Sequence, residues 1–196
     1  MQYQTYVDRL RPQLRKDALL YDILLIIGAS IFITLSAQIA FNVPFSPVPV
    51  TGQTFAVLLT GSFLGSRRGA LAVLLYLFEG VAGIPVFAQA HAGLIHLFGP
   101  TGGYLFGFIP AAYLCGMMVE KGWGRSMFTI LLVMFIGTNV IFFFGLIWLS
   151  FFIGTENVLM LGFYPYIAGA MIKIIAATLI YSGSGQLTKN NTKVDG

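Results

Sequence analysis

Residues 126–153 read SMFTILLVMFIGTNVIFFFGLIWLSFFI, a run of 28 residues without Asp, Glu, Lys or Arg. A helix needs about 20 apolar residues to cross about 30 Å of lipid hydrocarbon. Because this run exceeds that length, it predicts a membrane-spanning helix that is tilted in the bilayer. This segment is therefore expected to fold in lipid rather than in water.

The whole chain has the same character. Of its 196 residues, 57% are hydrophobic and only 9% are charged, and the mean hydropathy is +0.84. A soluble domain carries about 25% charged residues to cover its surface in water. The net charge of +4 comes from short clusters between apolar runs, a pattern that does not indicate nucleic-acid binding. The composition predicts one domain embedded in lipid.

Six apolar runs divide the chain, as judged from hydropathy along the sequence. The second and third runs are short for a span, so we expect them to pack against other helices and to join irregular segments that line a cavity. The sequence therefore predicts an all-α integral membrane protein with six transmembrane helices. The six runs cover residues 23–41, 51–64, 69–82, 102–119, 126–153 and 165–182.

The basic residues indicate how the spans are oriented. With six spans, ten of the eleven Lys and Arg residues fall on one side of the membrane, and the opposite connections contain none. Cytoplasmic loops are enriched in basic residues, so both termini are predicted to be cytoplasmic. Residues 1–22 then form a cytoplasmic N-terminal segment, 23–182 the transmembrane substrate-binding domain, and 183–196 a polar cytoplasmic tail. The ten basic residues are Arg9, Arg11, Arg15, Lys16, Arg67, Arg68, Lys121, Arg125, Lys189 and Lys193.

Two of the connections without basic residues have an unusual composition. The first is rich in proline and continues into residues 51–54, which read TGQT; the second, residues 83–101, is long and contains both histidines. Proline stiffens such segments and glycine permits close approach of a ligand, although hairpin connections at a membrane surface also collect both residues. Because the two connections lie on one side, we expect a lidded cavity open to the outside. Its candidate ligand-binding residues are Thr51, Gln53, Gln89 and His91.

Residues 99–104 read GPTGGY and open the fourth run. The N-terminus of a helix presents unpaired N–H groups with a partial positive charge. Gly102 and Gly103 permit a carboxylate or a ring to approach this backbone, so both glycines and the following Tyr104 are candidate ligand-binding residues. No Walker A sequence occurs in the chain, so any ATP-driven step must come from a partner.

Two ionisable residues, Glu79 and Lys173, lie inside apolar runs. A charge there costs about 2.5–3.5 kcal/mol on insertion scales, which makes each residue a functional candidate. One interpretation is a structural Glu79–Lys173 ion pair. The other is that Lys173 binds an anionic or strongly polar part of a substrate.

Asn139 lies near the middle of the fifth run. A buried Asn in lipid either joins helices by hydrogen bonds or contacts a ligand, and both interpretations stay open. His91 and His96 have no clustered acid or thiolate, which does not indicate a metal site. No nucleophile is paired with a base, so we expect neither an enzyme nor a cofactor.

Three segments carry a resemblance to a known family. They are PVPVTGQT at 47–54, GIPVF at 83–87 and GPTGGY at 99–104. Together they resemble the biotin-uptake substrate-binding (S) component family, BioY, of energy-coupling factor (ECF) transporters. The resemblance implies a bacterial plasma-membrane protein of six helices, surrounded by lipid, that binds biotin or a biotin-like carboxylate vitamin beneath extracellular loops. It also implies a coupling subunit and two ATPase subunits as partners.

The sixth run departs from the family in one position. The family commonly has Gly-Asp, two residues and then Lys, whereas here Ala170 takes the place of the aspartate and Lys173 matches the lysine. A carboxylate would accept the N–H donors of biotin's ureido ring, and alanine cannot. Either Glu79 supplies that acceptor from another helix, or the ligand lacks a ureido group, as lipoate does. The prediction is an S component for biotin or a biotin-like carboxylate vitamin, with a lipoate-specific S component as the alternative. A membrane-embedded enzyme and an assembly subunit without a ligand are less favoured.

Overall fold

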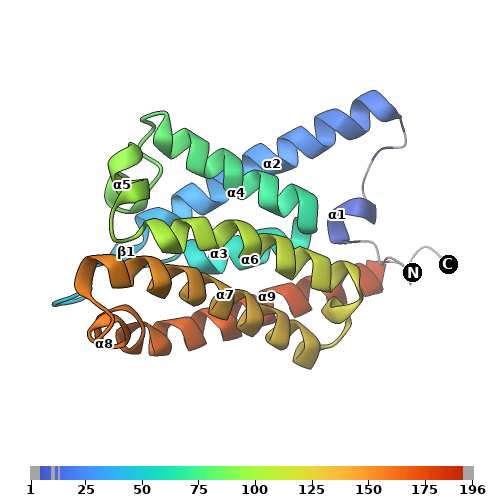
Figure 1. Cartoon of the computed structure of the whole chain (residues 1–196). Helices are drawn as coiled ribbons and strands as arrows, with labels where there is room; N and C mark the ends of the chain where they lie inside the picture. The colour runs from blue at the N-terminus through green and yellow to red at the C-terminus, as the bar shows by residue number, and fades with distance from the viewer. Residues whose placement is uncertain (1–4, 10–11, 13, 192–196) are drawn as a thin grey trace.

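A computed structural model describes residues 5–9, 12 and 14–191, and it is mostly helical (Figure 1). The elements follow in chain order. They are α1 (Tyr6–Arg9), α2 (Arg15–Gln38), β1 (Ala40–Phe41), β2 (Val50–Thr51), α3 (Gln53–Leu64), α4 (Ser66–Val81), η1 (Ala88–Ala90), α5 (Leu94–Phe98), α6 (Gly102–Glu120), η2 (Trp123–Arg125), α7 (Met127–Ile153), α8 (Val158–Gly162), η3 (Tyr164–Tyr166) and α9 (Ile167–Asn191).

Six long helices in the described part of the chain lie at the six predicted apolar runs: α2, α3, α4, α6, α7 and α9. Helix α2 begins at Arg15, before its apolar run, and α9 continues to Asn191, past the predicted boundary at residue 182. Hydropathy marks only the part of a helix that lipid can surround, whereas backbone hydrogen bonding extends into the polar turns. The remaining parts of the two predicted terminal segments, residues 1–4, 10, 11, 13 and 192–196, lie outside the described residues.

Helix length divides the six into two groups. Four stretches of the described chain are long and apolar enough to cross a membrane by themselves: Lys16–Gln38, Gly102–Glu120, Met127–Ile153 and Val158–Ser184. Helices α3, with 12 residues, and α4, with 16, are shorter. Both pack against α6, as expected from the short runs.

The core lies where α3, α4 and α7 surround α6. Leu58, Tyr76, Ala112 and Met134 from these helices are almost fully buried. A Cβ atom at Gly61 of α3 would collide with the backbone of Ala112, so the glycine allows α3 and α6 to touch. The outer faces of α2, α7 and α9 leave large apolar side chains exposed, which suits contact with lipid.

The two ends of the bundle differ (Figure 1). Helices α5 and α8 and the β1–β2 hairpin lie at one end, and α1 and the end of α9 lie at the other. The hairpin pairs Ala40 with Thr51 and Phe41 with Val50 in antiparallel register, which closes the proline-rich loop between them. We call the first end the loop end and the second the α1 end.

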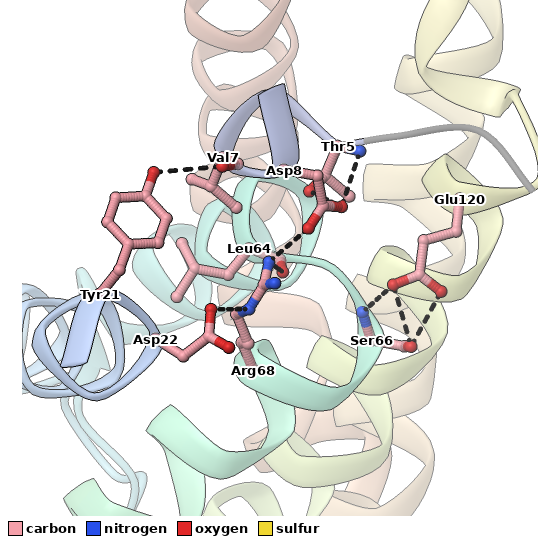
Figure 2. Close-up of polar contacts among 9 residues, drawn as sticks. All are labelled: Thr5, Val7, Asp8, Tyr21, Asp22, Leu64, Ser66, Arg68 and Glu120. Carbon is pink, nitrogen blue, oxygen red and sulfur yellow. Dashed lines mark hydrogen bonds and ion pairs between the residues drawn. The ribbon is translucent and has the colours of Figure 1, made fainter. Parts of the chain in front are cut away.

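Charged side chains at the α1 end form an internal cluster (Figure 2). The guanidinium of Arg68 lies 2.8 Å from a carboxylate oxygen of Asp8 and 2.8 Å from one of Asp22. This arrangement joins α1 and α2 to the first turn of α4. Nearby, the carboxylate of Glu120 accepts a hydrogen bond of 2.7 Å from the backbone N–H of Ser66, where α3 turns into α4.

Candidate ligand-binding cavity

A cavity of about 500 Å³ opens at the loop end of the bundle. The proline-rich loop, the segment of residues 87–101, and helices α3, α6, α7 and α9 each contribute to its lining. The two connections that the sequence singled out therefore meet over one cavity. Its volume falls in the range of about 300–1,000 Å³ that small-molecule sites occupy.

Six of the ten candidate residues line this cavity, and they come from loops and helix termini as well as from α9. Phe87, Phe108 and Phe142 add aromatic surface between these polar groups. The six candidates are Thr51, Gln53, Gln89, His91, Tyr104 and Lys173.

Lys173 extends from α9 toward the first turn of α3. Its Nζ donates a hydrogen bond of 2.7 Å to the backbone carbonyl of Thr51 and one of 3.0 Å to Oγ1 of Thr54. An ammonium group has three N–H donors, so one remains for a ligand. Among the described residues that line the cavity, none is Asp or Glu. The charge of Lys173 therefore has neutral partners around it.

Glu79 lies elsewhere, apart from both Lys173 and the described cavity lining. Its Oε2 accepts a hydrogen bond of 2.6 Å from Oγ of Ser30, between α4 and α2. Glu79 is absent from the described cavity lining, and the described ion pairs do not join it to Lys173. Ala170, by contrast, does line the cavity, one helical turn from Lys173.

Thr51 and Gln53 hold the start of α3 in place. Oγ1 of Thr51 donates a hydrogen bond of 2.8 Å to Oε1 of Gln53, and Nε2 of Gln53 donates to the hydroxyl of Tyr76 on α4. All of these side chains are buried. This network orients the Thr51 carbonyl that Lys173 contacts.

The segment of residues 87–101 lines the cavity at the loop end of the bundle, and we call this part of the cavity its mouth. Nε2 of Gln89 donates a hydrogen bond of 2.8 Å to Oδ1 of Asn42 in the proline-rich loop. The rings of His91 and His96 stack with their centroids 4.3 Å apart. Partial burial and the neighbouring His91 lower the pKa of His96 below its usual value. Both imidazoles line the cavity, and the segment thus brings polar rings and amides to its mouth.

Two tyrosines connect the cavity wall to the α7–α9 connection. The hydroxyl of Tyr104 donates a hydrogen bond of 2.9 Å to the carbonyl of Gly162. The hydroxyl of Tyr166 donates to the carbonyl of Val48 in the proline-rich loop. Tyr166 was not among the sequence candidates, although its place directly after Pro165 at the start of the sixth run was a signal.

Gly102 and Gly103 lie outside the cavity lining and have a packing role instead. A Cβ atom at Gly102 would collide with the carbonyl of Leu97, and one at Gly103 would collide with Trp148 of α7. Nε1 of Trp148 donates a hydrogen bond of 2.9 Å to the carbonyl of Gly99. The glycines thus allow α7 and the start of α6 to approach each other.

Asn139 is on the outer face of α7. Its Nδ2 donates a hydrogen bond of 2.8 Å to the carbonyl of Phe135, one turn earlier in the same helix. The neighbouring Thr138 lines the cavity instead. Consecutive helical residues are rotated by about 100°, so one position separates the two faces.

Comparison with known proteins agrees with this architecture. The chain matches the BioY family over residues 9–190, which confirms the resemblance drawn from the three sequence segments. A probable biotin transporter BioY of Pyrococcus horikoshii is 37% identical over 75% of this chain and 85% of that protein. The biotin transporter BioY of Thermotoga maritima is 38% identical over 79% and 92%. The relatives are transporters, in agreement with the prediction that the chain is not an enzyme.

A solved structure shows the same fold. It is the S-component for biotin from an ECF-type ABC transporter, with a TM-score of 0.80 and 23% sequence identity. The match covers 88% of this chain and 95% of that one. The all-helical membrane fold predicted from the sequence is confirmed at this level.

Proposed function

Because this chain belongs to the BioY family, we propose that it is the substrate-binding component of an importer for biotin, with the cavity at the loop end as the ligand site. The relatives at 37% and 38% identity are named biotin transporters. The fold matches that of an S-component for biotin. The cavity has the volume of a small-molecule site, and its lining combines apolar and aromatic residues with polar groups, which suits a vitamin with an apolar ring and a polar end.

The observation that carries this proposal is the environment of Lys173. The ammonium group has neutral partners in the described structure, and no carboxylate is among the described cavity residues. A partly buried cation without a counter-ion favours an anionic ligand, because the ligand supplies the missing charge in a poorly solvated site. Biotin has one carboxylate, and we assign its recognition to Lys173.

The remaining site assignments follow the cavity lining. Thr51 and Gln53 hold Lys173 in place, Gln89 and His91 cover the mouth, and Tyr104 forms part of the wall. With Ala170 in the aspartate position, the ureido N–H groups of biotin must meet neutral acceptors. The amides of Asn42 and Gln89 and the carbonyls of the surrounding loops are such groups. Glu79 has no part in ligand binding in this scheme.

The same proposal covers orientation and partners. The basic residues between the spans support a cytoplasmic α1 end, with the loop end outside a bacterial plasma membrane. No Walker A sequence occurs in the chain, so a coupling subunit and two ATPase subunits would supply the energy for transport. Residues 23–182 would form the substrate-binding domain.

Calorimetric titration of purified protein with biotin and with lipoate tests the ligand. We expect stoichiometric biotin binding, with lipoate binding more weakly. Ala170→Asp should weaken the binding of both vitamins about tenfold, because an acid one helical turn from Lys173 would supply the counter-ion that the proposal assigns to the ligand carboxylate. Glu79→Gln is the matched control and should leave the biotin Kd unchanged. Tighter binding of lipoate than of biotin to the wild type would refute the ligand assignment.

A further inference from the structure

The segment that covers the cavity mouth contains an unfavourable backbone turn. Gln89 and Ala90 have φ angles of 60° and 57°, in the left-handed region. Side chains with a Cβ atom disfavour this region, and Asn and Gly are its usual occupants. Two consecutive residues of other types in this conformation require an external contact to hold them there.

Gln38, the last residue of α2, supplies such a contact. Its Nε2 donates a hydrogen bond of 3.2 Å to the carbonyl of Thr34 in the same helix, one of 3.3 Å to the carbonyl of Phe87 and a longer one of 3.5 Å to that of Val86. Its Oε1 accepts a hydrogen bond of 3.0 Å from the backbone N–H of Ala90. One side-chain amide therefore bridges the two arms of the turn. Only this orientation of the amide satisfies both arms, since carbonyls accept and an N–H donates.

The turn carries ligand-facing residues, although Gln38 is outside the described cavity lining. Phe87, Ala88, Gln89 and His91 all line the cavity. Within the turn, the backbone N–H of Phe87 donates a hydrogen bond of 3.0 Å to the carbonyl of His91. That bond closes the turn on itself, whereas the Gln38 amide attaches it to α2. If the Gln38 amide were lost, the hydrogen bond between Phe87 and His91 would remain. Gln89 and Ala90 could then move out of the left-handed conformation.

We propose that Gln38 is a positioning residue for ligand binding, which holds residues 86–90 in the conformation that closes the cavity mouth. This inference rests on the proposed function, because it assigns the residues of the turn to the ligand. Without these hydrogen bonds of Gln38, which we call the Gln38 clamp, the fraction of molecules in the binding-competent form falls. The apparent Kd rises by the inverse of that fraction.

Gln38→Ala tests the proposal through biotin affinity and its rescue. We expect the biotin Kd to rise about tenfold. Adding Ala90→Gly should recover about three- to fivefold of this loss, because glycine adopts positive φ without the steric cost. Ala92→Gly is the matched control: Ala92 lies in the same segment, outside the described cavity lining and the described positive-φ residues. It should recover nothing.

Hydrogen exchange of the backbone amides of residues 86–93, measured without ligand, separates this inference from the proposed function. Gln38→Ala should speed exchange at His91, whose backbone N–H donates to the carbonyl of Ala88 within the turn, and Ala90→Gly should slow it again. Equal biotin Kd and equal exchange in wild type and Gln38→Ala would overturn the positioning role, as would rescue by Ala92→Gly. If the wild type binds no biotin, the proposed function fails, and the role of Gln38 toward that ligand fails with it. The exchange data still decide whether the clamp exists.

Discussion

At the α1 end of the bundle, Arg68 lies 2.8 Å from the carboxylates of both Asp8 and Asp22, whereas at the loop end Lys173 donates to a backbone carbonyl and a hydroxyl. Both cations are largely shielded from solvent inside a lipid-embedded fold. The first is neutralised by side chains of its own chain, so its energy contributes to holding α1, α2 and α4 together. The second has neutral partners among the described residues, and in the function that we propose its charge is available to a ligand. We thus assign the cation with two carboxylates to stability and the cation with neutral partners to binding.

Replacing Arg68 should produce the largest effect on stability. Arg68→Met removes the cationic partner of two partly buried carboxylates, and we expect a loss of about 2–4 kcal/mol of unfolding free energy. The denaturation midpoint in detergent measures this loss, with the exposed neighbour Arg67→Met as the matched control. The biotin Kd of Arg68→Met should match that of the wild type at temperatures where the variant is folded. Equal stability of the two variants would remove the structural role from the cluster.

Replacing Lys173 should affect binding rather than stability. Hydrogen bonds to charged groups contribute about 1.5–3 kcal/mol, so Lys173→Met should raise the biotin Kd by about 10- to 100-fold. The denaturation midpoint without ligand should change less than in Arg68→Met, because the desolvation cost of the lysine charge offsets its two hydrogen bonds to neutral groups. Titration calorimetry measures the affinity, and Lys121→Met, an exposed cation outside the cavity, is the control. An unchanged Kd in Lys173→Met would break the contrast between the two cations.

Acid should reveal the smallest of the three effects, at Asp8. Burial raises the pKa of Asp8, but hydrogen bonds from Thr5 and Arg68 and the charge of Arg68 outweigh it and hold the pKa below the usual 3.8. A carboxyl with a lowered folded-state pKa stabilises the fold above its unfolded pKa, and this contribution is lost as pH falls through the folded pKa.

In the wild type, the free energy of unfolding should therefore fall as the pH drops below about 4. Asp8→Asn should reduce this fall by less than about 1 kcal/mol. Unfolding midpoints across a pH series measure this slope, with the exposed Asp17→Asn as control. If Asp17→Asn flattens the curve as much as Asp8→Asn, the ion pair with Arg68 does not explain the acid sensitivity.

The candidate residues show how far the sequence leads. Loop residues such as Gln89 and His91 could be found because their connections combine Pro, Gly and polar residues without basic ones. Lys173 could be found because a charge in an apolar run is energetically costly and therefore indicates a function or a specific partner. Glu79 satisfied the same criterion, yet it contacts Ser30 of α2. The free-energy cost of burying a charge in lipid identifies an unusual residue. It does not show whether the partner of that charge is a ligand or a neighbouring helix.

The sequence by itself determined the solvent of this protein, the positions of the long helices and the side on which basic residues gather, because these depend on composition and on runs of local residues. The tertiary structure decided which face of each helix meets the cavity. Apolar residues surround α7 on all sides, so nothing local distinguishes Thr138, which lines the cavity, from Asn139, which does not. It also decided that the amide of Gln38 reaches Ala90, since that contact joins residues 52 positions apart. Such pairings depend on how the helices pack, and no local pattern encodes them.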